Sequence, residues 1–348
     1  MSRMRTDELD FDLPAELIAQ APPPHRSDSR LMHYRRADRS VAHRTFSDLP
    51  ALLRPGDLLV FNDARVIPAR FTLRKSTGGR VEGLFLNEVR PARWHVLLKN
   101  AANIAAPLRF ADAPEIAVNV IHSGAGGEHE IGVDTALSAI DLLERVGRMP
   151  LPPYIRRDKD RDQRDELDRV RYQTVFARTP GAVAAPTAAL HFTDRLLADL
   201  LSRGVEQTFI TLHVGLGTFK PVTADTLEAH AMHAETYSTT PAAVEALNRA
   251  KRDGRRIVAV GTTSARVLES QPADEPFMPK SDRTGIFIYP AYQWKHVGAL
   301  VTNFHLPRST LIALVAAMVG LDEQRRLYQI AIENRYRFFS YGDAMLIE

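Results

Sequence analysis

The sequence contains no cysteine. This absence excludes a disulfide framework, a thiolate metal site and a cysteine nucleophile, so any bound metal would need histidine and carboxylate ligands. Long apolar segments are also missing, because the longest run, residues 311–319, has nine residues, whereas a helix that crosses a bilayer needs about 20. The opening sequence MSRMRTDELDFDLP has no apolar core typical of a secretory signal. We therefore expect a soluble protein without a membrane segment, located in the cytoplasm.

Short signatures of several common enzyme classes are absent as well. The sequence has no G-x-G-x-x-G after a strand, no G-x-x-x-x-G-K-[ST], no G-x-S-x-G and no H-E-x-x-H. These absences disfavour a dinucleotide oxidoreductase, a P-loop NTPase, an α/β-hydrolase and a zincin. Lysine is scarce, since it supplies only seven of the 45 basic residues. The many arginines suit contacts with phosphates and bases, but they also fit a compositional bias, and a net charge of +3 does not by itself indicate nucleic-acid binding.

The composition is that of a globular protein, with 45% hydrophobic and 25% charged residues in a chain of 348 residues. Short apolar or alternating runs between residues 70 and 133, separated by Gly, Pro and Asn, predict an antiparallel sheet or small barrel. The rest of the chain alternates between segments with the periodicity of a helix and segments with that of a strand. We expect helices at residues 14–20, 137–146, 193–202, 241–252, 264–270, 309–319 and 322–335, and strands at 31–34, 57–62, 207–214, 256–260 and 285–289.

This alternation predicts a mixed α/β main domain that is discontinuous in sequence, formed by residues 1–65 and 154–348. An antiparallel β-barrel-like domain, residues 66–153, is inserted into it. The segment 156–171 is dense in Arg and Asp. It is typical of a solvated loop or helix face, and the alternative is a segment that contacts RNA.

Candidate functional residues lie at the ends of predicted strands. Gly261-Thr262-Thr263-Ser264 follows a strand and opens a helix, so its backbone N–H groups suit a carboxylate or phosphate; the alternative is an ordinary N-cap. Another strand ends in T-L-H-V-G-L-G-T. There one face of the strand carries Thr211, His213 and Gly215, and the glycines, Gly217 included, let a ligand approach the backbone.

Further candidates are several histidines and a segment near the end of the sequence that is rich in aromatic residues. On a helix, His230 and His233 would lie on one side, where the two imidazoles could bind a metal or share a proton, and Glu235 could orient or replace them. His191 and His305 lie at similar junctions between apolar and polar residues, but no compact metal-ligand spacing links the six histidines from 191 to 305. The segment YRFFSYGD, which ends at Asp343, could stack bases or form an aromatic core followed by a turn.

At these residues the chain resembles a known family. About ten blocks lie in the family's order along almost the whole sequence: FDLPAELIAQAP with RSDSRL, GDLLVFNDARVIPAR, MPLPPYI, YQTVFA with GAVAAPTAALHFT, TLHVGLGTFKPV, HAMHAETY, VAVGTTSARVLES, GIFIYP, LVTNFHLPRSTL and YRFFSYGDAMLI. They are similar to the motifs of the S-adenosylmethionine:tRNA ribosyltransferase-isomerases of queuosine biosynthesis. The sequence departs from the family's usual pattern at Gly83, Ala189 and Arg308.

The resemblance implies an α/β domain with an inserted β-barrel, as the strand pattern also predicts. It implies transfer of the ribosyl group of S-adenosylmethionine onto 7-aminomethyl-7-deazaguanine at the tRNA wobble position. Rearrangement of the ribose would yield epoxyqueuosine and release adenine and methionine. S-adenosylmethionine is then a co-substrate, and we expect no other cofactor, no metal and a monomeric enzyme.

On this basis we assign expected roles. The sulfonium acidifies the adjacent C5′ hydrogens, and the candidate bases are His213, His233 and Glu235. Departure of adenine could be assisted by Asp343 or His191. The expected substrate-binding residues include Thr262, Thr263 and Arg266 for the methionine carboxylate, together with Ser264, Thr211, Gly215 and Gly217. The expected tRNA contacts are Arg26, Arg30, Arg337 and the segment 156–171.

Two other functions remain open at this point. A histidine-metal hydrolase would lose its activity to a chelator, whereas the ribosyltransferase-isomerase would not. A non-catalytic RNA-binding module would bind tRNA without releasing adenine.

Overall fold

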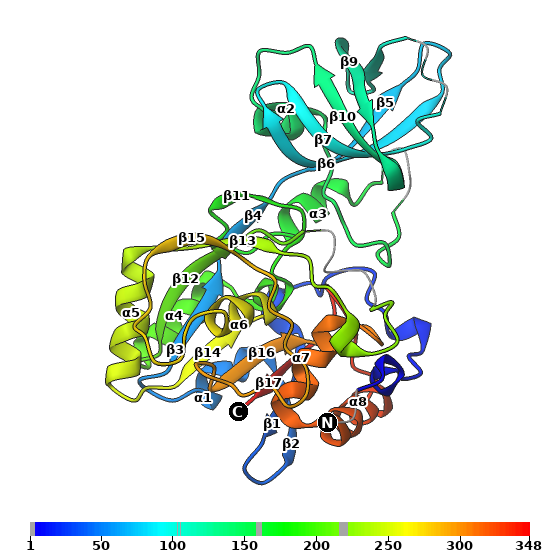
Figure 1. The fold of residues 1–348 in the computed structure, drawn as a ribbon. Helices are drawn as coiled ribbons and strands as arrows, with labels where there is room; N and C mark the ends of the chain where they lie inside the picture. Colours follow the sequence, from blue (N-terminus) through cyan, green and yellow to red (C-terminus); the bar gives the residue numbers. More distant parts are fainter. Residues whose placement is uncertain (1–3, 103, 105, 158–161, 216–221) are drawn as a thin grey trace.

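The computed structural model describes residues 4–102, 104, 106–157, 162–215 and 222–348. It has two bodies, a large α/β body and a smaller barrel, joined by a narrow region around β4, β11 and α3 (Figure 1). This architecture confirms the predicted fold class. All six strands of the barrel lie within residues 66–153, while the two boundaries that we placed there stay a prediction. No helix among the described residues is both long and apolar enough to span a bilayer.

The large body is built on a nine-stranded mixed sheet. The inner strands β12, β3, β14 and β16 are mutually parallel, and the buried sequences LLVFN, IVAV and ALVTN of the last three are typical of strands covered on both faces. The order in the sheet is β15 (Lys280–Thr284), β13 (Glu235–Thr239), β12 (Glu206–Leu212), β3 (Leu58–Asn62), β14 (Ile257–Val260), β16 (Ala299–Asn303), β17 (Ala344–Ile347), β1 (Arg30–Arg35) and β2 (Ser40–Thr45).

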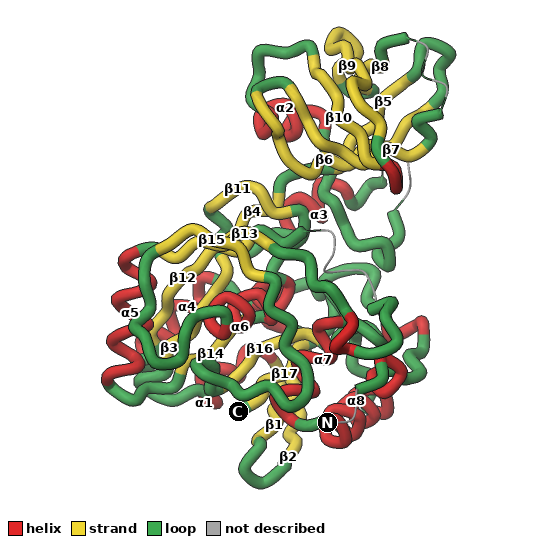
Figure 2. Tube along the Cα trace, viewed as in Figure 1, coloured by secondary structure: helices red, strands yellow, loops and turns green. Residues whose placement is uncertain are grey.

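Helices cover both faces of this sheet (Figure 2). Side chains alternate along each strand, so Leu59 and Phe61 of β3 pack with α1 and α4, whereas Leu58 and Val60 pack with the cluster that includes α5–α8. The helices are α1 (Leu49–Leu52), α4 (Asp194–Ser202), α5 (Pro241–Arg252), α6 (Thr262–Glu269), α7 (Thr310–Val319) and α8 (Leu321–Glu333). Short 3-10 helices occur at Thr6–Leu9, Ala15–Leu17, Arg26–Asp28, Phe46–Asp48, Ala125–Gly127, Thr187–His191 and Leu227–Ala229.

The smaller body is a closed antiparallel barrel around Trp94, which is fully buried among Phe71, Phe85 and Phe110. Helix α2 (Ala139–Val146) packs its leucines into the same core. The order of strands is β10 (Glu128–Val133), β7 (Arg93–Lys99), β6 (Arg80–Arg90), β5 (Arg70–Arg74), β8 (Leu108–Phe110) and β9 (Ala113–Ser123), with β10 and β9 closing the ring.

The junction between the two bodies is compact. There the parallel ribbon of β4 (Ala64–Val66) and β11 (Thr179–Ala182) lies near α3 (Asp165–Arg171) (Figure 1). Gly147 follows α2, and a Cβ atom at this position would lie 1.8 Å from the carbonyl oxygen of Pro68. Only glycine therefore allows the barrel's exit strand to pass this close to its entry strand.

Three expectations about local structure are wrong. Residues 14–20 contain only a single 3-10 turn. Residues 230–234 have no regular secondary structure and Glu235 begins β13, so His230 and His233 do not share a helix face. The strand expected at 285–289 lies instead at 280–284, as β15. The strands β2, β4, β11, β13, β16 and β17 were not predicted.

Candidate functional site

A cavity of about 40 Å³ lies at the carboxyl ends of the parallel strands β14 and β16. Ligands of open α/β sheets bind at this edge. Helix α6 begins in the cavity wall, where Gly261 has a φ of 89°, a conformation that favours glycine. The free N–H groups of the first turn of α6 therefore lie at the cavity. The lining residues are Ala184, Ala185, Pro186, Thr187, Ala188, Val214, Gly261, Thr262, Thr263, Thr302, Asn303, His305 and Leu311.

A buried ion pair supports α6 from the neighbouring strand. Glu235 of β13 binds Nη1 of Arg266 through Oε2, and its Oε1 accepts from the backbone N–H of Gly215 at 2.9 Å. Both side chains are nearly inaccessible, at 5% and 6% exposure. The second terminal nitrogen of Arg266, Nη2, is buried and has no hydrogen-bond partner in the described part of the chain. Glu235 is therefore held as an anchor between β13, α6 and the residue after Val214.

A second cluster of polar side chains lies where β3 and β12 end. The hydroxyl of Thr211 donates to Asp63 at 2.6 Å and lies 3.4 Å from the hydroxyl of Thr179. The backbone N–H of His213 donates to Thr236, and its Nδ1 is buried without a hydrogen-bond partner among the described residues. Burial lowers the pKa of His213 below its ordinary value of 6.5, and the charge of Asp63 opposes that shift.

Sequence reasoning did not single out Asp63. The feature of the sequence that could have identified Asp63 is its position, because it directly follows the buried strand β3 within the block FNDAR. A carboxylate at the carboxyl end of an inner strand meets the other strand ends in an α/β sheet. Asp63 is 9% exposed, so its charge acts on His213 through an environment that screens it only partly.

Asp63→Asn is expected to lower the pKa of His213 further. The variant keeps an oxygen that accepts from Thr211, but it removes the negative charge that raises this pKa. The lower pH at which His213 takes up a proton can be measured by NMR titration of its ring hydrogens, with His129 of the barrel as the control. An unchanged or raised pKa would show that Asp63 does not act on the imidazole.

The third cluster ties the cavity wall to the end of the sheet. The side-chain amide of Asn303 accepts from Thr187 at 2.8 Å and donates to Nε2 of His191 at 3.2 Å and to the backbone carbonyl of Asp343 at 3.3 Å. Burial lowers the pKa of His191 to about 3, and it lowers that of His305, whose Nε2 lies 2.7 Å from the Thr302 hydroxyl, to about 3. Both imidazoles are therefore neutral at physiological pH.

The carboxylate of Asp343 is occupied away from the cavity. It accepts from the backbone N–H groups of Arg30 and Arg337 at 3.0 and 2.8 Å. Of the other expected site residues, His233 is exposed, Ser264 is fully buried with an unpartnered hydroxyl in the described structure, and Gly217 lies outside the described residues. The structure thus gathers Thr211, His213, Gly215, Glu235, Thr262, Thr263 and Arg266 around neighbouring strand ends. The carboxylate of Asp343 is bound instead by the N–H groups of Arg30 and Arg337, and His233 is exposed.

The three arginines expected to contact RNA are engaged within the protein. Arg26 donates to the carbonyls of Leu190 and Val170. Arg30 donates to the carbonyl of Asn334 and lies 3.9 Å from the centre of the Tyr336 ring. Arg337 lies 3.4 Å from the carboxylate of Asp343. Their role in RNA binding stays a prediction.

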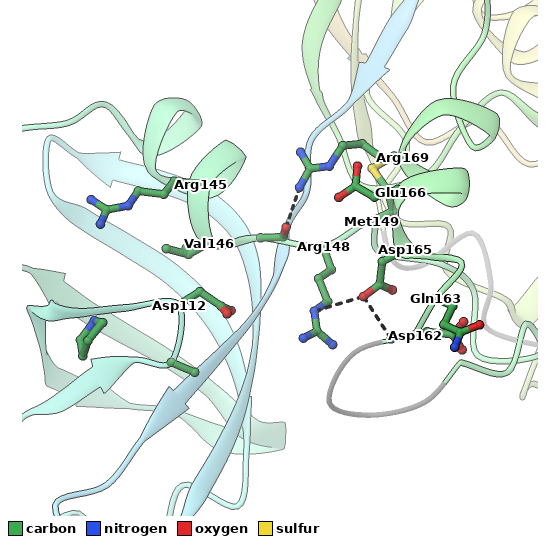
Figure 3. A pocket seen from close by; sticks show the side chains of 13 residues that line it. Asp112, Arg145, Val146, Arg148, Met149, Asp162, Gln163, Asp165, Glu166 and Arg169 are labelled. Carbon is green, nitrogen blue, oxygen red and sulfur yellow. Dashed lines mark hydrogen bonds and ion pairs between the residues drawn. The ribbon is translucent and has the colours of Figure 1, made fainter.

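A wider cleft of about 840 Å³ separates the barrel from α3 (Figure 3). Arg169 crosses part of it, donating to the carbonyl of Gly147 at 3.0 Å, and Arg148 forms an ion pair with Asp165 at 3.5 Å. The described residues contain no group of three or more His, Asp or Glu side chains placed to share a metal ion.

Comparisons with known proteins agree on one family. The model of the family described as queuosine biosynthesis protein matches residues 6–347. The chain is 49% identical to the S-adenosylmethionine:tRNA ribosyltransferase-isomerase of Ralstonia pickettii, with 98% of this chain and 93% of that protein covered. It is 48% identical to the protein of the same name from Anaeromyxobacter dehalogenans, with 99% of each covered.

A solved structure shows the same relationship. The crystal structure of the S-adenosylmethionine tRNA ribosyltransferase from Thermotoga maritima is 34% identical, covers 98% of this chain and 100% of that chain, and superposes with a TM-score of 0.55. An identity of this size over the full length of both chains shows common membership. The chain therefore belongs to the queuosine biosynthesis protein family, that of the S-adenosylmethionine:tRNA ribosyltransferase-isomerases.

Proposed function

We propose that the protein transfers the ribosyl group of S-adenosylmethionine onto 7-aminomethyl-7-deazaguanine at the wobble position of tRNA. The ribose is isomerised during the transfer, giving epoxyqueuosine in tRNA and releasing adenine and methionine. The observation that carries this proposal is the full-length identity of 48–49% to relatives with that name. The site supports it, because a helix N-terminus, a neutral imidazole and a buried carboxylate meet at one edge of the sheet.

Among the candidate bases the geometry favours His213. Its imidazole is uncharged at neutral pH because burial lowers its pKa, and its Nδ1 has no partner in the described structure. An uncharged imidazole nitrogen can take the C5′ hydrogen that the adjacent sulfonium acidifies. Glu235 is less suited to this role, since one of its oxygens holds Arg266 and the other holds the N–H of Gly215. We assign Glu235 to positioning.

The first turn of α6 is the proposed seat of the methionine carboxylate. Thr262 and Thr263 line the cavity there, and a helix N-terminus stabilises a negative charge. His191, linked to the cavity wall through Asn303, is neutral and remains the proposed partner for the departing adenine in preference to Asp343, whose carboxylate is already occupied. S-adenosylmethionine is a co-substrate in this scheme, with no further cofactor, and the enzyme acts in the cytoplasm as a monomer.

Incubation with S-adenosylmethionine and tRNA carrying the aminomethyl deazaguanine is expected to release adenine and methionine in equal amounts. Both products can be followed by mass spectrometry. The matched control is the same tRNA with guanine at the wobble position, which lacks the attacking amine and should release neither. Substrate tRNA that yields no adenine with folded protein would refute the proposal, and loss of adenine release in the presence of a chelator would favour the metal hydrolase.

A further inference from the structure

Asp63 is a buried carboxylate that forms no ion pair with any residue that the structure describes. One of its oxygens, Oδ1, accepts from the hydroxyl of Thr211 at 2.6 Å. The other, Oδ2, has no hydrogen-bond partner in the described structure, and it keeps some accessible surface. Burial of a charge without a partner is costly, so a carboxylate in this state at the end of an inner strand indicates a positively charged ligand.

Two arginines adjoin Asp63 through the backbone, and the guanidinium of each is engaged elsewhere. Arg65 follows Asp63 by two positions and forms an ion pair with Glu144 at 2.8 Å. The backbone N–H of Arg178 donates to the carbonyl of Asp63, but its guanidinium lies 5.0 Å from the centre of the Phe209 ring. These two cations therefore do not serve as partners of the Asp63 carboxylate.

The side chains beside Asp63 are uncharged and can accept hydrogen bonds. The Thr179 hydroxyl lies 3.4 Å from that of Thr211. Burial lowers the pKa of His213 below its ordinary value of 6.5, so its imidazole is neutral at physiological pH and does not repel a cation. A carboxylate, a hydroxyl and a neutral imidazole suit a primary ammonium, because this group has three donors and no acceptor.

The proposed reaction brings two such groups to the protein, one on the aminomethyl base and one on the methionine part of S-adenosylmethionine. The methionine ammonium is attached to the same carbon as the carboxylate that we place at the first turn of α6. Thr262 and Thr263 line the cavity there, whereas Asp63 is not part of its lining. The aminomethyl group has to reach the ribosyl group whose C5′ hydrogen we place at His213, and the charge of Asp63 acts on that imidazole.

We propose that the carboxylate of Asp63 binds the ammonium of the 7-aminomethyl group and so selects the modified base over guanine. This inference rests on the proposed function, because it takes that base to be the acceptor. On the same edge guanine offers N7, which is an acceptor, and it would leave the carboxylate without a donor. A site built to pair a polar group of its substrate rejects an analogue that lacks this group.

The wild-type protein, without S-adenosylmethionine, is expected to bind tRNA with the aminomethyl base about tenfold more tightly than the same tRNA with wobble guanine, the effect of one charge-assisted hydrogen bond. Asp63→Asn should bind both tRNAs about equally. This variant keeps an oxygen that accepts from Thr211, so its fold should persist. Both affinities are measured at one salt concentration, so that their ratio cancels the general effect of charge on RNA binding. A ratio in Asp63→Asn as large as in the wild type would overturn the proposal.

The matched control is Asp199→Asn on α4, which removes one negative charge from an exposed pair with Arg203. Its ratio should equal that of the wild type, and an equal loss in both variants would overturn the proposal. A tRNA carrying 7-cyano-7-deazaguanine tests the charge itself, because the cyano group is neutral. The wild type should bind it no more tightly than the guanine tRNA. Binding as tight as that of the aminomethyl tRNA would assign the preference to shape and refute the ammonium contact.

S-adenosylmethionine alone distinguishes the two sources of the ammonium. It should raise the midpoint of thermal unfolding of Asp63→Asn as much as that of the wild type, because it binds away from this carboxylate. A variant that loses this stabilisation but keeps the preference between the tRNAs would show that Asp63 binds the methionine ammonium. The assignment to the base would then fail.

These measurements separate the ammonium contact from the proposed function. Binding of tRNA is measured without S-adenosylmethionine, whereas the reaction is detected as adenine release by the wild-type protein. A wild-type protein that prefers the aminomethyl tRNA through Asp63 but releases no adenine would refute the reaction and retain the contact. A wild-type protein that releases adenine while Asp63→Asn keeps the preference would refute the contact alone.

Discussion

Replacement of His213 by alanine is expected to lower the maximal rate of adenine release about 100-fold to 10,000-fold, the usual contribution of a positioned general base. The imidazole lies beside the end of β12, where the hydrogen bond from its backbone N–H to Thr236 fixes its place. Its Nδ1 has no partner among the described residues. The rate should be measured with both substrates saturating, so that the loss reports on the chemical step.

His129→Ala is the matched control for this variant. His129 lies in barrel strand β10, and its side chain lies 2.9 Å from the exposed Ser123 hydroxyl, so turnover should stay near that of the wild type. Thermal unfolding of both variants separates a loss of chemistry from a loss of folded protein. A decrease of less than about fivefold in His213→Ala, or a larger decrease in His233→Ala, would remove His213 from the role of base.

Removal of the Glu235 carboxylate is expected to lower the free energy of unfolding by about 3–5 kcal/mol, as is usual when one partner of a buried ion pair is deleted. Glu235→Ala leaves the charge of Arg266 buried without its partner, and it also deprives the N–H of Gly215 of its acceptor. Because α6 begins at the cavity, the loss should also disturb the proposed carboxylate seat. Urea unfolding at equilibrium measures the change.

Two comparisons make this expectation specific. Asp199→Ala breaks an ion pair with Arg203 in which both side chains are about half exposed, and it should cost less than about 1 kcal/mol. The double variant Glu235→Leu with Arg266→Met replaces both charges by apolar groups and should recover much of the stability lost by Glu235→Ala. A cost for Glu235→Ala no larger than that for Asp199→Ala would contradict a buried anchoring pair.

The sequence pattern predicts the strands that are buried on both faces better than those at the edge of the sheet. Strands β3 and β14 are continuous apolar runs, and they were predicted close to their observed bounds. Strand β15 has the sequence KSDRT, of which only Thr284 is buried, and its extended form comes from pairing with β13. Residues 285–289 are more apolar, but Ile288 enters the core without any strand pairing.

In the candidate site, too, local sequence patterns predict some features and miss those that depend on contacts between distant residues. The start of α6 was predictable because a glycine followed by hydroxyl residues is a local signal for a helix N-terminus. The contact between Thr211 and Asp63 joins residues 148 positions apart, and no local pattern specifies it. Glu235 and Arg266 were both expected in the site, but as a base and a carboxylate ligand. Their mutual pairing arises only when β13 and α6 are brought together.

The placement of β17 has a consequence for the order of folding. β1 and β2 reach the rest of the nine-stranded sheet through β17, which lies between β16 and β1. The contact of Leu31 with Ala344 spans 344 − 31 = 313 positions. During synthesis the β1–β2 hairpin therefore has to wait for almost the whole chain before it can dock, and contacts of such long range slow folding. Until then the apolar side chains on its two faces, Leu31 on one and Met32 on the other, are left to chaperones or to non-native partners.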